Sequence, residues 1–413
     1  MSVRRFVERL RSALWFLPGV FLALAILQAL VIPEWEERHG GTAVGEFFFE
    51  GGPDGARVLL SMVSGSTLTL MVLVFSITIV ALQLASSQFS PRVLRSFLRD
   101  WYSQLSLGVF TATFAYSITV LRAVRSDEAG STAFVPRLAV ALAFFWALAS
   151  VVVFVLYVHH TASSIRVVSV IGRIGTESRA MIERDYLAPV HGAGTAAAAP
   201  PDGAPDEVLM APVSGVLTDV EVGRLDRLAT EVGVRVRLAV PVGDFVPVGA
   251  PLLLVHGGTA GDRAQAMVRT VGLGAERTYR QDVRYGFRQL VDIAERALSP
   301  AVNDPTTAVQ ALDRIHDLLR LLGTAPWPSG THGRVTLPQV PWEAIVRLAV
   351  DEIRLCGSTS VQVDRRLRDL LLDVAGAVPP ERRPVVEEEL RLLEAGVRRA
   401  IVDEEDRNHA LDG

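Results

Sequence analysis

Residues 13 to 33 read ALWFLPGVFLALAILQALVIP, an apolar run about as long as the hydrocarbon core of a bilayer requires. Only Gln28 places a polar side chain in it. Four arginines precede the run, namely Arg4, Arg5, Arg9 and Arg11. This start resembles a signal peptide, but the apolar run is too long for one and further apolar runs follow. The sequence therefore predicts an uncleaved first transmembrane helix.

Three further apolar stretches, at about residues 57 to 84, 104 to 124 and 134 to 158, predict three more spans. The chain is 50% hydrophobic with a mean hydropathy of +0.32, which also indicates that part of it lies in lipid. No acidic residue or histidine lies in the middle of a span, which argues against a proton-coupled pump. The prediction is an α-helical integral membrane protein with a four-helix transmembrane domain at 1–158.

Arginines flank the spans unequally, and basic residues prefer the cytoplasmic side. One side carries Arg4, Arg5, Arg9, Arg11, Arg92, Arg95, Arg99, Arg166, Arg173 and Arg179. The other side carries Arg38, Arg122, Arg125 and Arg137. The bias predicts a multi-pass protein of the bacterial inner (plasma) membrane with both the N- and C-termini in the cytoplasm.

The second and third spans carry small and polar residues on one face each. At 100° per residue, the stripe of the second span comprises Ser61, Gly65, Thr69, Ser76, Gln83 and Ser87, of which the first five are the candidate pore-lining residues. The matching face of the third span includes Gln104, Gly108, Thr111 and Thr119. Such residues allow close helix packing, or they could line a water-filled path in an oligomer whose first and fourth spans face lipid. Both interpretations stay open at this stage.

Beyond the spans, the sequence predicts a juxtamembrane helix at 159–190 that continues the fourth span, and a flexible linker at 191–207. A small β module follows at 208–256. Its pieces APVSGVLTDV and VGDFVPVGAPLLLV resemble the two halves of a biotinyl-lipoyl-type barrel-sandwich hybrid. The chain contains no lysine to carry such a group, so we expect a structural or sensing module. A generic small β-barrel is the alternative.

The region 260–405 is predicted to be a helical cytoplasmic domain, with a tail at 406–413. Charged residues recur every four positions and predict one ridge on a helix: Arg280, Arg284, Arg288, Asp292 and Arg296. The ridge could be a solvated face, an ion-pair network between subunits or an anion site. The turn with Ser299, Asn303 and Asp304 suggests a helix cap before Pro305, or a polar site.

Several function classes are excluded by composition. All 41 basic residues are arginine, which removes phosphate-binding loops, kinases and pyridoxal enzymes that depend on a lysine. A lone Cys356 excludes an internal disulfide and a multi-cysteine metal site. The net charge of −4 disfavours nucleic acid as a partner. No catalytic motif is found, so we expect no enzyme, no cofactor and no metal.

Two phrases carry a family resemblance: STLTLMVLVFSITIVALQLASSQFSPRVLRSF, from the second span onward, and RQDVRYGFRQLVDIAERALSPAVNDPTTAVQALDRI. They resemble the bacterial predicted membrane proteins filed as domain of unknown function 2254, over nearly the whole chain. The resemblance implies a multi-span membrane protein with a cytoplasmic domain, and it supplies no activity and no catalytic residue.

The favoured prediction from the sequence is an oligomeric passive channel for a small ion or solute, with a cytoplasmic regulatory domain. The two polar spans and the soluble domain after the fourth span favour it. The alternative is a membrane-anchored scaffold or sensor without transport activity. The expected partners are the lipid bilayer and further copies of the chain.

Overall fold

The computed structural model describes residues 15–40, 43–88, 101–126, 133–164, 166–187, 203–328 and 330–411. The chain forms two compact units, Met1–Arg166 and Val167–Gly413. Some predictions lie outside the described residues: the arginines before residue 15, the loop with Arg92, Arg95 and Arg99, and most of the linker at 191–207.

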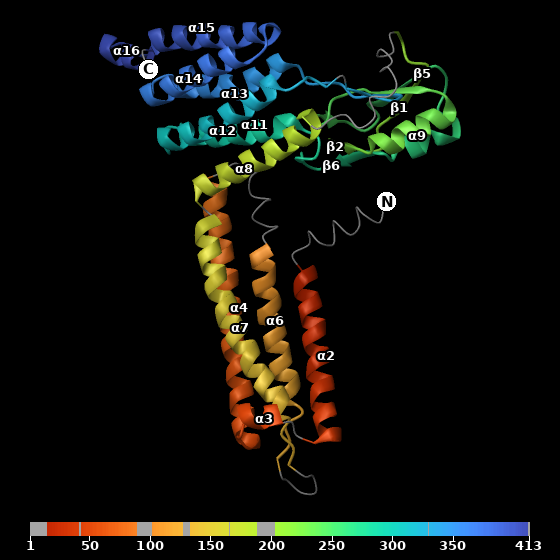
Figure 1. The fold of residues 1–413 in the computed structure, drawn as a ribbon, viewed down its shortest axis with the longest axis vertical. Coiled ribbons are helices and arrows are strands. Elements are labelled where there is room, and N and C mark those ends of the chain that lie inside the picture. The colour runs from red at the N-terminus through yellow and green to blue at the C-terminus, as the bar shows by residue number, and fades with distance from the viewer. Residues whose placement is uncertain are drawn as a thin grey trace. The chain divides into compact units, whose positions relative to one another are not determined.

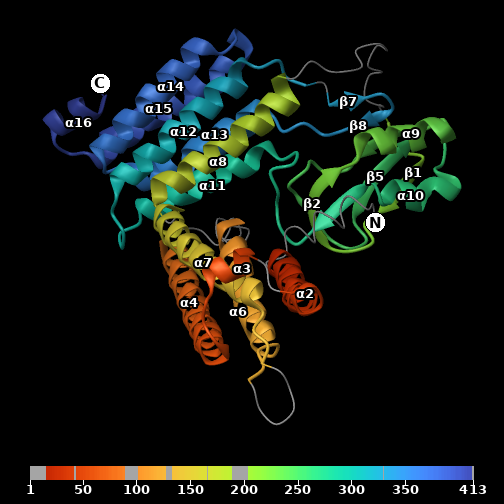
Figure 2. The ribbon, with the colours of Figure 1, turned by 60° about the horizontal axis from the view of Figure 1, so that its bottom comes forward.

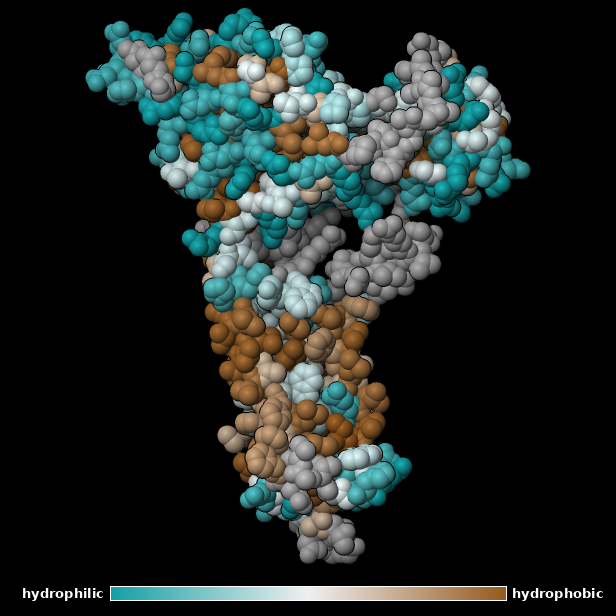
Figure 3. Space-filling model, viewed as in Figure 1, coloured by the Kyte–Doolittle hydropathy of each residue, from teal (hydrophilic) through white to brown (hydrophobic). Residues whose placement is uncertain are grey.

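The first unit contains four helices that are long and apolar enough to cross a membrane (Figure 1). They are α2 (Phe16–His39), α4 (Pro53–Gln88), α6 (Trp101–Leu121) and α7 (Arg137–Ser164), and a short helix α3 (Ala43–Phe48) packs on α7. The four predicted spans are thereby confirmed as helices. Hydrophobic residues cover most of this unit's length in Figure 3.

Helix α6 is the central helix of this unit, because it packs on α2, α4 and α7. Within its most apolar 18-residue window, 56% of residues are buried, against 17% in α2 and in α4 and 28% in α7. The other three helices therefore present most of the outer surface, and α6 provides the inner contacts.

Two helix ends differ from the prediction. Helix α2 continues past the apolar run to His39. Helix α7 ends at Ser164 and α8 begins at Val167, so the fourth span and the juxtamembrane helix are separate helices. Ser163 Oγ donates to the carbonyl of His159 at 2.9 Å, and such bonds from serine to the preceding turn weaken a helix.

The helices of the second unit form a layered bundle (Figures 1 and 2). They are α8 (Val167–Ile182) with the π-helical turn η1 (Glu183–Leu187), α11 (Val283–Ala297), α12 (Pro305–Thr324), α13 (Trp342–Gly357), α14 (Val361–Ala377), the 3₁₀ turn η3 (Pro380–Arg382), α15 (Arg383–Ala400) and α16 (Glu404–Leu411). Helix α8 packs on α11 and α12, and α16 packs on α14 and α15. The predicted tail therefore contributes to a packed helix.

The β module of the second unit has two sheets and two helices of its own. Its elements are β1 (Glu207–Met210), β2 (Gly215–Val220), α9 (Val222–Val232), β3 (Arg235–Leu238), β4 (Phe245–Val246), β5 (Pro251–His256), the 3₁₀ turn η2 (Gly261–Arg263), α10 (Ala264–Val268), β6 (Val271–Gly274), β7 (Thr331–His332) and β8 (Val335–Thr336). The strand orders are β1-β5-β3-β8-β7 and β4-β2-β6. All pairs are antiparallel except β3 with β8.

One hydrophobic core joins the two sheets to α9, with Leu217, Leu225, Val236, Leu253 and Val255 among its buried residues. Within the described residues the sheets do not close into a barrel, so the barrel-sandwich prediction is not confirmed. The predicted boundaries of 208–256 and 260–405 also change, because β6, β7 and β8 come from the segment that was predicted to be helical.

Candidate functional site

The polar stripe of α4 lies on the outer surface of the four-span unit. Its candidate pore-lining members are all exposed: Ser61, Gly65, Thr69, Ser76 and Gln83. The side of α4 that packs on the bundle carries Ala56, Leu60, Val63, Thr67 and Val74, which are buried. At 100° per residue the two sets lie about 180° apart around the helix. Packing within one chain therefore does not account for the stripe.

The stripe is only mildly polar. Thr69 Oγ1 donates to the carbonyl of Gly65 at 3.1 Å, and Ser76 Oγ donates to the carbonyl of Val72 at 3.0 Å. The hydroxyl protons are thereby satisfied within α4. Val72 and Ile79 fall in the same angular sector and are also exposed.

The polar residues of α6 lie inside the bundle instead. Thr111 and Thr119 are half-buried, and Thr119 Oγ1 donates to the carbonyl of Ala115 at 2.7 Å. On the opposite face of α6, the hydroxyls of Thr113 and of Ser150 in α7 are 2.9 Å apart and hydrogen-bonded. The bond between Thr113 and Ser150 links α6 to α7, whereas Thr119 bonds within α6, and these residues are separate from the outward stripe of α4.

A buried carboxylate ties α2 to α7 within the same unit. Glu36, near the end of α2, is 3% exposed. Its Oε1 accepts from the backbone N–H of Leu138 at 2.9 Å and its Oε2 from that of Ala139 at 3.2 Å. The first N–H groups of a helix have no partner inside the helix, and negative charge is stabilised there. Glu36 therefore acts as an N-cap for α7 supplied by another helix.

Replacing Glu36 by Gln should lower the stability of the four-span unit by roughly 1–2 kcal/mol, because a neutral amide offers one acceptor oxygen in place of two charged ones. The measurement is denaturation of the purified protein in detergent, followed by tryptophan fluorescence. Glu37 provides the matched control, since it is a half-exposed residue in the same turn that pairs with Arg125. Equal losses for Glu36→Gln and Glu37→Gln would contradict this assignment.

The predicted arginine ridge is shorter in the structure than in the sequence. Helix α11 begins at Val283, because the side chain of Asp282 accepts from the backbone N–H of Arg284 and caps the helix. Arg280 therefore lies in the loop before α11, and the ridge prediction is wrong for this residue. Arg280 instead approaches Asp219 of β2 at 3.6 Å.

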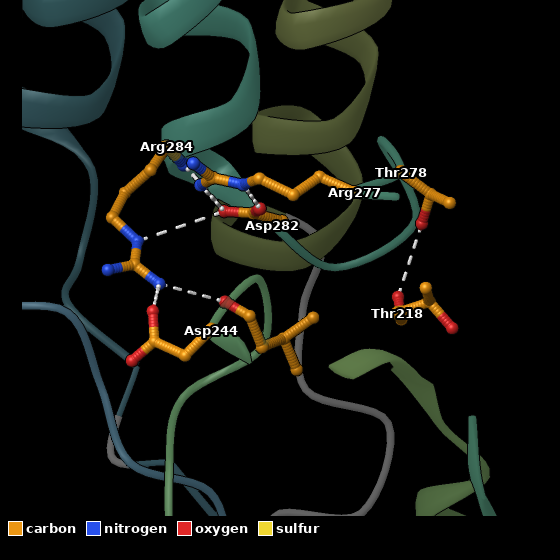
Figure 4. A network of polar contacts seen from close by, with 7 residues as sticks. Thr218, Asp244, Arg277, Thr278, Asp282 and Arg284 are labelled. Atoms are coloured by element: carbon orange, nitrogen blue, oxygen red, sulfur yellow. Dashed lines mark hydrogen bonds and ion pairs between the residues drawn. The ribbon is translucent and has the colours of Figure 1, made fainter. Parts of the chain in front are cut away.

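Arginines on both sides of Asp282 form a network between α11 and the β module (Figure 4). Arg277 donates to both carboxylate oxygens of Asp282, at 2.6 and 2.9 Å. Arg284 Nη2 donates to Asp244 Oδ1 at 2.6 Å and to the carbonyl of Val242 at 3.1 Å. Asp282 is almost fully buried, and these arginine partners offset the cost of burying its carboxylate.

The close approach at Asp282 requires a glycine at position 243. Gly243 has a φ of +97°, and a Cβ there would come within 2.2 Å of Asp282 Oδ2. A hydrogen bond also fixes the loop before α11 to β2, since Gln281 Oε1 accepts from the N–H of Val220 at 2.9 Å. The helical bundle and the β module are therefore joined by specific polar contacts within one chain.

Arg288 makes a second network, between α11 and α13. Its Nε donates to Asp292 Oδ1 at 2.6 Å, its Nη2 donates to Glu295 Oε2 at 2.9 Å, and its Nη1 pairs with Glu352 of α13. Burial, followed by the charge of Glu352, raises the pKa of Glu295. The remaining arginine of the ridge, Arg296, lies exposed in the last turn of α11.

The carboxylates that pair with Arg284 and Arg288 show what kind of surface the arginine ridge is. The charges of Arg284 and Arg288 are matched by carboxylates of the same chain, which a free anion would have to displace. The ridge is thus an intrachain ion-pair network, an arrangement that the sequence alternatives did not include. The signal for it was Asp282, an N-cap residue directly before an amphipathic helix.

The turn after α11 is a capping turn. Asp304 Oδ1 accepts from the backbone N–H of Thr307 at 3.1 Å, and Pro305 occupies the first helical position of α12. Ser299 Oγ donates to the carbonyl of Arg296 at 2.7 Å. Asn303 takes a positive φ of 47°, which asparagine tolerates better than most residues. The predicted helix cap is confirmed.

Comparison with known proteins shows which family the chain resembles. The chain matches, over residues 11–373, a family described as "Predicted membrane protein (DUF2254)". Uncharacterized proteins of Mycobacterium bovis and Mycobacterium tuberculosis are each 33% identical to it over 419 residues, which is 98% of this chain and 80% of each relative. No solved structure matches the chain. The chain therefore belongs to this family of predicted membrane proteins, as the two sequence phrases indicated.

Proposed function

We propose that the protein assembles into a homo-oligomer in the bacterial inner membrane and conducts a small ion or solute along the stripes of α4. The observation that carries this proposal is the position of the stripe, which faces away from the chain's own bundle. Small and polar residues gain little from contact with lipid tails, whereas they suit a subunit interface or a hydrated path.

We further propose that the second unit is cytoplasmic and regulates conduction. The excess of arginine near Arg166, Arg173 and Arg179 supports this orientation. Covalent linkage supports the regulatory role, because α8 follows α7 after two residues and packs on α11 and α12. The short connection in the chain between the two units is therefore the feature on which the regulatory proposal rests.

A scaffold or sensor is the second candidate, and a specific observation favours it. Val72 and Ile79 share the sector of the stripe, and the hydroxyls of Thr69 and Ser76 are bonded within α4. Such a surface also suits dry contact between α4 helices of neighbouring subunits. In this candidate the stripe holds an oligomer together and conducts nothing.

Cysteine labelling separates the two candidates. Thr69, Ser76 and Gln83 are replaced one at a time by Cys in a Cys356→Ser background, since Cys356 is exposed and would react itself. If the stripe lines a hydrated path, all three cysteines should react with a membrane-impermeant thiol reagent, and Gln83→Leu should lower conductance in reconstituted bilayers.

Two controls on the same helix define the background. Leu73→Cys places a thiol on the exposed apolar surface, and Val74→Cys places one inside the bundle. Both should stay unreactive. Protection of all three stripe cysteines at the level of these controls, in an oligomer of defined mass, would favour the scaffold and reject the pore. A stable monomer would contradict both candidates, because each requires contact between α4 helices of neighbouring subunits.

A further inference from the structure

The outer face of the five-stranded sheet carries an unusual group of arginines. Strand β3 alternates between buried Val236 and Leu238, which point into the core, and exposed Arg235 and Arg237 on the other face. The parallel pairing of Val236 with Val335 places Arg334, directly before β8, beside Arg235. We call Arg235, Arg237 and Arg334 the arginine face.

The arginine face differs from the arginine networks of α11. Within the described part of the chain, Arg235 and Arg237 make no side-chain hydrogen bond or ion pair, and the guanidinium of Arg334 donates only to carbonyls, at 3.0 Å to Gly233 and 3.5 Å to Val234. Like charges on neighbouring sheet positions destabilise a protein unless they are neutralised. Among the described residues, these three arginines therefore form a positive surface whose guanidinium groups are not paired with a carboxylate.

A buried histidine lies at the edge of the same face. His256 of β5 is the direct antiparallel partner of Arg235, so the two side chains lie on one side of the sheet. His256 is only 7% exposed, and its Nε2 has no hydrogen-bond partner in the described structure. A ligand bound on this face would give His256 Nε2 a partner, which buried polar atoms in native proteins usually have.

Two carboxylates border the arginine face, and both are already bonded to backbone groups. Asp206 Oδ2 accepts from the N–H groups of Gly257 and Gly258 at 2.6 and 3.1 Å, which lowers the pKa of Asp206. Asp226 Oδ1 accepts from the N–H of Arg334 at 2.7 Å. In the described part of the chain, both carboxylates bond backbone N–H groups, and neither pairs with the guanidinium of an arginine of this face.

We propose that the arginine face, together with His256, binds a phosphate-bearing ligand. Guanidinium groups recognise phosphate through two parallel N–H donors, and side chains two residues apart on a strand lie about 7 Å apart. That spacing suits an anion with several phosphate oxygens. A lipid headgroup and a soluble phosphate ester share this chemistry. The inference goes beyond the channel proposal and holds whether or not α4 conducts.

Titration of the full-length protein with inorganic pyrophosphate tests the inference. Binding is measured by calorimetry in nanodiscs of phosphatidylcholine alone and in nanodiscs that also contain phosphatidic acid. Arg235→Gln/Arg237→Gln should weaken pyrophosphate binding by roughly tenfold for each arginine removed. Arg235→Lys/Arg237→Lys should retain part of the affinity, because charge remains and the paired donors are lost. His256→Gln should also weaken binding.

The matched control is Arg269→Gln, which removes one exposed arginine elsewhere on the β module. It should leave pyrophosphate binding unchanged. Weaker pyrophosphate binding in the nanodiscs with phosphatidic acid identifies a lipid headgroup as the competing ligand, and equal binding in both identifies a soluble one. The proposal is overturned if wild type does not bind pyrophosphate, or if the double variant and the control bind it equally.

Discussion

Replacing Asp364 by Asn should raise the stability of the second unit at about pH 8 by roughly 2–4 kcal/mol. Asp364 lies in the first turn of α14, is fully buried, and neither of its carboxylate oxygens has a hydrogen-bond partner in the described structure. Burial alone raises the pKa of Asp364 from 3.8 to about 7. An asparagine of the same shape carries no charge to bury.

The raised pKa of Asp364 determines how the stability of the second unit changes with pH. The folded state holds the Asp364 proton more tightly than the unfolded state, so this carboxyl costs no stability below about pH 4. Between about pH 4 and pH 7 the unfolded chain ionises first, and stability should fall as pH rises. Above pH 7 the full cost is present. Asp364→Asn should remove this fall, and its gain over wild type should vanish at about pH 4.

Thermal unfolding of the full-length protein in detergent, at a series of pH values, measures the effect through tryptophan fluorescence, to which Trp327 and Trp342 of the second unit contribute. The control is Asp369→Asn, an exposed position on the same helix, which should change little. Glu389 has a pKa raised to about 7 by burial as well, so some pH dependence should remain in every variant. A loss of stability in Asp364→Asn at all pH values would show that the ionised carboxylate has a partner.

Replacing Gly286 by Leu should destabilise the second unit by about 3 kcal/mol or more, because α8 and α11 cross in contact at this position. A Cβ on Gly286 would come within 1.8 Å of Ser178 Oγ and 2.8 Å of Ser178 Cβ. Since the serine Cβ is fixed to its backbone, the two helices must separate. Unfolding in urea, followed by tryptophan fluorescence, measures the loss.

Gly172 on α8 provides the contrast, because nothing lies within 4 Å of a Cβ placed there. Gly172→Ala should be neutral or should stabilise α8 by up to about 1 kcal/mol, as alanine favours a helix. Gly286→Ala should already cost stability. If both alanine variants behaved alike, the close crossing of α8 and α11 would not exist in solution.

Much of the fold followed from local patterns in the sequence. The apolar runs predicted the four spans, since a bilayer demands uninterrupted helices of one length. Asp304 and Pro305 predicted the start of α12, because an N-cap and a first-turn proline act through neighbouring residues only. The resemblance in span two and in α11 predicted the family that the comparison then showed.

Other features depend on contacts between distant residues. Strands β4, β7 and β8 have two residues each, too few for an alternating pattern, and they exist because their neighbours pair with them. The ridge pattern could not reveal that α11 begins only after Asp282, which leaves Arg280 outside the helix, or that Asp244 pairs with Arg284. The stripe on α4 was visible in the sequence, but only the packing of Leu60 and Val74 shows that it faces outward.

The pairing of β3 with β8 sets an order of events during synthesis. Val236 of β3 pairs with Val335 of β8, which is synthesised about a hundred residues later, so one side of β3 has no strand partner until then. Until then the edge of β3 is open, and open edges recruit other chains. A fragment ending before Thr331 would therefore expose that edge permanently. Synthesis delivers β1 to β6 before α11 and α12, and β7 and β8 only after them, so the five-stranded sheet can be completed only once α12 has been made.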